Sequence, residues 1–172
     1  PSTTWTWTYP TEILLRLTNQ LPASNPIAID FSGINNGSLG VESTNSSLYL
    51  TGNIQFPGSV QLVGGSGIFA SDAGLIKAQS VQFESSTGSV GTSTAPIEFD
   101  LAEGTPVNAT AKTGVFLSSQ GALLVGSIQA TSGDVVLAST GDIQGTGSST
   151  GASVLGMNIQ LNASNGSIGT QS

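Results

Sequence analysis

Apolar and polar residues alternate along most of the chain in short runs. In SSLYLTGNIQF (46–56), Leu48 and Leu50 fall on one side of an extended backbone, and Ile54 and Phe56 form a second short face. The same spacing recurs at Val60 and Leu62, Val81 and Phe83, Ile97, Phe99 and Leu101, Val115 and Leu117, and Ile159 and Leu161. A period of two predicts short strands with one face buried and the other polar.

A glycine, a small polar residue and then Val or Ile recur between these runs. TGSVGT (87–92) and NGSIGT (165–170) differ only in their first residue and in Val for Ile. The same pattern opens GNIQF (52–56), GSIQAT (126–131) and GDIQGT (141–146). We interpret these glycines as corners between strands. If the interval from Gly88 to Gly166 holds four turns, each turn takes about 20 residues, which is the size of a solenoid repeat.

Two all-β architectures fit short alternating strands. An antiparallel β-sandwich favours longer strands, regularly spaced turn signals and large aromatic side chains in its core. Only 6% of this chain is aromatic, and the corner pattern repeats. Stacked coils bury small aliphatic side chains in ladders and need glycine where the backbone turns with positive φ. The sequence therefore predicts a right-handed parallel β-helix of about 20 residues per coil, with the antiparallel β-sandwich as the alternative.

The N-terminal part of the chain, residues 1–26, departs from this pattern. Residues 11–21 carry apolar side chains at helical spacing after Pro10, and they fit a strand nearly as well. The segment ends at Pro22 and Pro26. Because solenoids need their ends covered, we expect residues 1–26 to form an N-terminal cap or entry element, and residues 27–172 to form the coils.

Composition narrows the class further. The 172 residues include 23 Gly, 3 Lys plus Arg and 10 Asp plus Glu, so the net charge is −7 and 8% of residues are charged. An average domain has roughly 25% charged residues. The 37% of hydrophobic residues supply a core, unlike a disordered chain. Nucleic acid is excluded as a partner because Arg16, Lys77 and Lys112 are scattered. The absence of Cys and His excludes disulfides and both serine and cysteine catalytic triads.

The stretch 88–145 carries a recognisable succession: a Gly-Ser-Val-Gly-Thr corner, a Pro-apolar strand, a Thr/Ala-rich strand and a Gly-Asp-Val strand. In this it resembles the repeat regions of very large bacterial surface exoproteins of the filamentous-haemagglutinin type, secreted by the two-partner route. The resemblance covers about residues 33–170. It implies a right-handed parallel β-helix that serves as the shaft of an extracellular adhesin or toxin. The secretion-domain signature of that family, built on Asn-Pro-Asn, is not matched by Asn25-Pro26-Ile27.

Three carboxylates are the main candidates for binding chemistry. Glu98 and Asp100 share the outward face of the expected strand IEFDL, roughly 7 Å apart, and Glu103 lies near the following turn. They suggest a weak contact with a cation or with a sugar. If the cation is calcium, it prefers six to eight oxygen ligands. The alternative is a solvated polar face. GGSGIFASD (64–72) resembles a calcium-binding nonapeptide, but Phe69 replaces its ligand Asp. We therefore predict no metal, no cofactor and no catalytic residue.

Two functions from different classes remain. The first is a structural shaft segment of a large secreted bacterial surface adhesin, which extends a binding tip from the cell towards glycans or proteins of a host or neighbouring cell. Its parent chain would leave the cell through an outer-membrane secretion transporter. The second is a self-assembling extracellular filament subunit that associates end to end, with Trp5 and Trp7 of TWTWT (4–8) in the docking strand. A polysaccharide-degrading β-helix enzyme is a further alternative, which rests on fold analogy alone.

Overall fold

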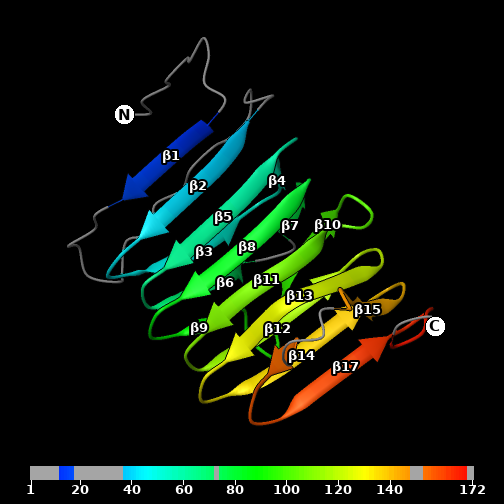
Figure 1. Cartoon of the computed structure of the whole chain (residues 1–172). Coiled ribbons are helices and arrows are strands. Elements are labelled where there is room, and N and C mark those ends of the chain that lie inside the picture. The colour runs from blue at the N-terminus through cyan, green and yellow to red at the C-terminus, as the bar shows by residue number, and fades with distance from the viewer. Residues whose placement is uncertain (1–11, 18–36, 72–73, 148–152, 170–172) are drawn as a thin grey trace.

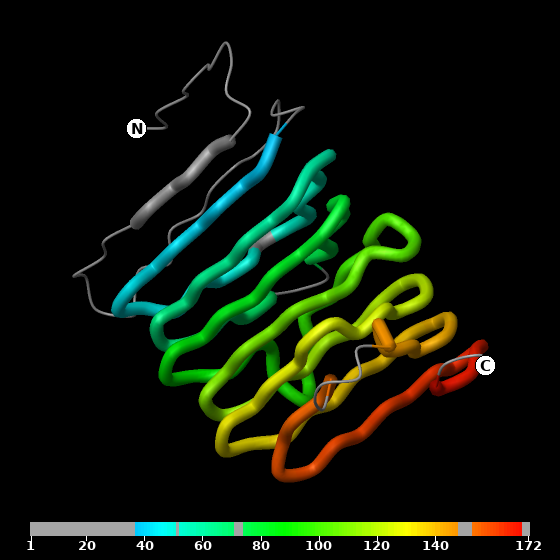
Figure 2. The backbone as a smooth tube through the Cα atoms, viewed as in Figure 1, coloured from blue at the N-terminus to red at the C-terminus, as the bar shows by residue number. Residues whose placement is uncertain are grey.

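The computed structural model describes residues 12–17, 37–71, 74–147 and 153–169. These residues form strands and no helix, and the strands stack as a β-solenoid of about six turns, roughly 21 residues apart. Figure 1 shows the strands lying side by side, and Figure 2 shows successive turns following one another along one axis from cyan to red. Every strand pairing within the described residues is parallel, for example β2 with β5 and β3 with β6. The antiparallel sandwich is therefore wrong.

The strands form two sheets, which we call wall A and wall B. Wall A contains β1 (Glu12–Leu17), β2 (Ser38–Ser43), β5 (Ser59–Gly64), β8 (Ser80–Ser85), β11 (Pro106–Ala111), β13 (Leu123–Ala130), β15 (Ile143–Gly145) and β16 (Val154–Leu155). Wall B contains β3 (Ser47–Thr51), β4 (Ile54–Gln55), β6 (Gly67–Ser71), β7 (Leu75–Ala78), β9 (Ser89–Val90), β10 (Ile97–Leu101), β12 (Gly114–Ser119), β14 (Asp134–Ser139) and β17 (Ile159–Ala163). In wall B, the short strands of the early coils converge on β12, which pairs with both β9 and β10.

The core consists of side chains stacked in register from coil to coil. One inward column of wall B runs through Leu48, Ile68, Val90, Val115, Val135 and Ile159. The four middle members have no exposed surface. The matching column of wall A runs through Val41, Leu62, Phe83, Ala109, Ile128 and Val154. The predicted alternation is thus confirmed, because residues two apart in each strand enter the same buried space.

Large and small side chains compensate one another across this core. Phe83 of wall A packs against Phe99 of wall B, with ring centroids 6.4 Å apart. The next member of the Phe83 column is Ala109, so a small side chain follows the largest one. Interiors are packed at crystal-like density, and such alternation fills the space without voids.

Serine and threonine hydroxyls tie the corners of neighbouring coils together. Thr87 Oγ1 donates to the Gly65 carbonyl at 2.9 Å, and Ser132 Oγ donates to the Lys112 carbonyl at 2.8 Å. Acidic and amide side chains accept hydrogen bonds from backbone N–H groups of neighbouring coils. For example, Asp142 Oδ1 accepts from the Ser167 N–H at 2.8 Å. A polar group that leaves water at a corner needs such a partner. The Ser- and Thr-rich composition therefore has a structural use on each turn.

The N-terminal segment resolves one open alternative. Residues 12–17 form strand β1, which pairs in register with β2, so Leu15 lies beside Val41. Within residues 11–21, the strand interpretation is correct for this part and the helix is wrong, because β2 offers a full row of backbone partners to an extended chain. The proposed boundary at residue 26 lies outside the described residues.

The predicted register of the corner motifs is wrong. Val90 of TGSVGT belongs to wall B, where it pairs with Ile68 and Val115, whereas Ile168 of NGSIGT forms a bridge with Ile143 of wall A. The two motifs sit at different corners, so the interval from Gly88 to Gly166 does not hold a whole number of coils. Both corners need a tight turn into an inward aliphatic residue, which is why their sequences coincide.

One predicted corner is not a corner. Gly126 of GSIQAT lies inside β13, where the pairing with β11 slips by one residue between Val107 and Ala109. At this bulge the Ser127 N–H donates to Asn108 Oδ1 at 2.9 Å, and a Cβ on Gly126 would lie 2.5 Å from the same oxygen. The glycine therefore serves a close approach of Asn108 in the middle of a strand.

No helix among the described residues has the length and hydropathy needed to cross a membrane.

Candidate functional site

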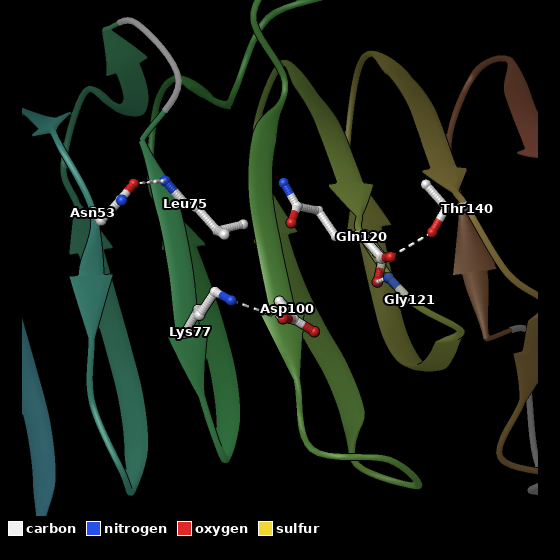
Figure 3. A network of polar contacts seen from close by, with 8 residues as sticks. Asn53, Leu75, Lys77, Asp100, Gln120, Gly121 and Thr140 are labelled. Atoms are coloured by element: carbon white, nitrogen blue, oxygen red, sulfur yellow. Dashed lines mark hydrogen bonds and ion pairs between the residues drawn. The ribbon is translucent and has the colours of Figure 1, made fainter.

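The predicted acidic residues lie on the outer surface of wall B. Glu98 and Asp100 are half-buried on β10 and point away from the core, because Ile97 and Phe99, which alternate with them, are buried. Glu103 is exposed in the turn that follows. Asp100 forms an ion pair: its Oδ2 lies 3.3 Å from Nζ of Lys77, as Figure 3 shows. Both side chains are about half exposed, so this ion pair contributes only about 0.2–1 kcal/mol.

The partner of Asp100 could not be read from the sequence. Lys112 is the basic residue nearest in sequence to the acidic group, but the β7–β10 register places Lys77 directly beside Asp100. Among the residues that the structure describes, no group of three acidic side chains could hold a metal ion. Glu98, Asp100 and Glu103 are thus not gathered into such a group, and a weak cation or sugar contact by these carboxylates stays a prediction.

The surroundings of this ion pair are a seam of contacts between coils. Figure 3 shows the Leu75 N–H donating to Asn53 Oδ1 of the preceding coil, at 3.1 Å. Further along, Thr140 Oγ1 donates to the Gln120 carbonyl of the coil before it. Each of these groups is used to join neighbouring turns. This seam therefore helps to hold the coils in register.

Trp5 and Trp7, the predicted docking strand, lie outside the described residues.

The structure brings together three aromatic side chains that the sequence did not connect. Tyr49, Phe69 and Phe116 lie on the outer surface of wall B, in one line along the stack, which we call the aromatic column. Tyr49 pairs in register with Phe69, and their ring centroids are 5.6 Å apart. In the next coil Val90 pairs with Ile68 and with Val115, so Phe116, the residue after Val115, continues the line. These residues are far apart in sequence, so only the coil register makes them neighbours.

A second surface lies at the last described coil. Ile159 and Ile168 end two inward columns, yet they are 49% and 52% exposed. Leu155 and Met157 of the same coil are also exposed. Ile159 was predicted to be buried; it is not, because within the described residues nothing stacks on it beyond Val135. Within the described residues, this coil therefore leaves apolar side chains exposed in the direction of the solenoid axis.

The chain matches no protein-family model, and neither a curated protein nor a solved structure is similar enough to it to count as a match.

Proposed function

We propose that this chain is a structural shaft segment of a large secreted bacterial surface adhesin. In this role it would hold a binding tip away from the cell, and its parent chain would be exported through an outer-membrane transporter. The observation that carries the proposal is the unbroken stacking of inward columns through the coils, such as the one from Leu48 to Ile159. The resemblance of residues 33–170 to filamentous-haemagglutinin-type repeats supports the same assignment.

A stack of coils is suited to act as a spacer, because its length increases with each added coil. Each coil uses roughly 21 residues and adds about 4.8 Å, the spacing between neighbouring strands. Contacts run between adjacent coils, so stability is approximately a sum of coil and neighbour terms. A spacer can therefore be lengthened or shortened by whole coils while its cross-section stays the same.

Coil modularity can be tested by deletion. Ser38, Ser59 and Ser80 occupy one register position, so removal of residues 59–79 deletes one whole coil and brings β8 onto β2. We expect a folded protein that is shorter by about 4.8 Å in small-angle scattering. The matched control removes residues 59–69, a fraction of a coil, and should unfold because the inward columns no longer meet. Unfolding of the whole-coil deletion would contradict the spacer role.

The adhesin assignment is tested separately by the coding sequence that flanks this segment. Further coils with the same corner motifs, together with an upstream two-partner secretion domain, would support it. A parent frame that lacks both would overturn it, whatever the deletion experiment gives.

The apolar end of the last coil favours a second candidate, a self-assembling extracellular filament subunit. Burial of Ile159 and Ile168 against the first coil of another copy would continue two columns that stop half exposed. The backbone supports this contact, because β17 pairs only with β14 within the described residues, and a strand with a free edge is a template for further pairing.

Electron microscopy and sedimentation of the isolated chain over a concentration series distinguish these candidates. Fibres that form with increasing concentration would support the filament, and they should disappear in Ile159→Ser and Ile168→Ser. Gln160→Ser is the matched control, since Gln160 is exposed on the outer face of the same strand. A monodisperse monomer at all concentrations would contradict the filament and leave the shaft.

A further inference from the structure

We propose that the aromatic column of wall B binds a neutral oligosaccharide that lies along the solenoid axis. The inference is independent of the shaft role, because a filament subunit would carry the same surface. The column consists of Tyr49 on β3, Phe69 on β6 and Phe116 on β12, with Gly91 at the coil between the two phenylalanines. From Tyr49 to Phe116 the register makes three steps, or about 14 Å at the usual strand spacing.

The two phenylalanine rings lie over glycines of their own strands. A Cβ on Gly67 would be 2.5 Å from Cζ of Phe69, and a Cβ on Gly114 would be 2.7 Å from Cε2 of Phe116. Each ring thus folds back over the glycine two residues before it on the same face of its strand. Both residues are half-buried, so part of each ring stays exposed to a ligand.

Gly91 follows β9 in the coil between the two phenylalanines. It has a φ of 71° and its Cβ position would collide with the Phe116 carbonyl oxygen, so no other residue fits there without strain. The phenylalanine rings are separated by two strand spacings, about 10 Å. Ser89, which pairs with Gly114, carries the small side chain between them, and its hydroxyl donates to the Gly91 carbonyl at 2.8 Å. Tyr49 continues the line and is 40% exposed.

Charge decides which ligand fits this surface. Strands β3, β6, β9 and β12 have the sequences SLYLT, GIFAS, SV and GVFLSS, with no charged residue. On the neighbouring strand β14, Asp134 pairs with Gly114 and brings a negative charge beside Phe116, which disfavours anions further. Nucleic acids and anionic polysaccharides gain affinity from Lys and Arg contacts, which these strands do not provide. A neutral ligand without such a requirement is favoured.

The shape of the column favours a sugar chain over a protein. The apolar surface is one ring wide and is flanked by small hydroxyl side chains such as Ser47, Ser89 and Ser118. A stable protein interface needs an area of about 1,200–2,000 Å² with a broad apolar core. The C–H face of a pyranose carries partial positive charge and stacks on the negative face of an aromatic ring, while its hydroxyls meet the flanking serines.

To test this, the whole chain is titrated with neutral hexasaccharides of glucose, galactose, mannose or N-acetylglucosamine at up to about 10 mM. Binding is monitored by NMR and by calorimetry. Uronate and sulfated hexasaccharides serve as charged comparisons. We expect at least one neutral chain to bind, and Phe69→Leu or Phe116→Leu to weaken its binding at least tenfold. Leucine keeps apolar cover over the glycine but removes the flat ring.

Two controls separate binding from folding. Gln61→Leu makes a matched change on the exposed face of wall A and should leave binding unchanged. Tyr49→Leu alters the most exposed ring, and it should weaken binding even if a phenylalanine variant fails to fold. The proposal is overturned if no neutral chain binds, if only charged chains bind, if the variants bind normally, or if the column binds a protein partner and no sugar. None of these results bears on the flanking-sequence test of the shaft.

Discussion

The most direct test of the column architecture compares the same substitution at two places in one column. Ile68 and Ile159 both belong to the inward column of wall B. Ile68 has no exposed surface, because Leu48 and Val90 stack on either side of it, whereas Ile159 is 49% exposed at the end of the column. The change to alanine removes three carbons in each case, so any difference in stability reports on position alone.

The expected magnitudes follow from burial. Three carbons at about 0.8 kcal/mol each give a transfer contribution of about 2.4 kcal/mol for a fully buried side chain. Ile68→Ala also leaves an enclosed cavity, which raises the loss to about 3–4 kcal/mol. Ile159→Ala loses about half of the transfer contribution, or about 1.2 kcal/mol, and leaves no enclosed cavity. The two variants should therefore differ by about 2 kcal/mol.

Urea unfolding followed by far-UV circular dichroism measures both losses, provided that the m-values of the variants match that of the parent chain. Low protein concentration keeps the chain monomeric. Equal losses at the two positions would refute the reasoning, since they would mean that Ile159 is as well packed as Ile68. A loss for Ile159→Ala that grows with protein concentration would indicate that another molecule buries this side chain, as the filament candidate requires.

Three further predictions concern corners, faces and charge. Gly133→Ala should destabilise the fold by about 1–3 kcal/mol, because the new Cβ would collide with the Thr113 carbonyl. In Gly121→Ala the new Cβ meets no atom within 4 Å, so this variant should be neutral or stabilise the fold by about 0.4–1 kcal/mol. Equal melting temperatures of the two variants would contradict this prediction. Leu117→Asp should prevent folding as judged by circular dichroism, since it buries a charge. Ser118→Asn on the outer face should change stability by less than about 0.5 kcal/mol. Asp100→Asn should lose about 0.2–1 kcal/mol in urea unfolding, and the loss should vanish in about 1 M salt; a loss that persists in salt would show a role beyond the ion pair.

The sequence by itself determined which side chains face inward. In an extended chain, successive residues point to opposite sides, so GVFLSS already assigns Val115 and Leu117 to the core and Phe116 to the surface, as the structure confirms. The glycine-bounded runs likewise predicted short strands, an all-β fold and a repeat of about 20 residues. These features depend on residues that are close together in the chain, so the sequence alone contains the information that sets them.

Only the tertiary structure decided which residues of neighbouring coils lie side by side. Along the wall A column, the chain takes a longer path from Phe83 to Ala109 than from Leu62 to Phe83, because that coil includes a longer corner at residues 91–96 and a turn at residues 102–105. Corner motifs at different walls share the same sequence, so they could not reveal these lengths. The pairing of Lys77 with Asp100 and the aromatic column both depend on this register. Contacts between coils are set by the summed lengths of strands and corners, a quantity that no local pattern specifies.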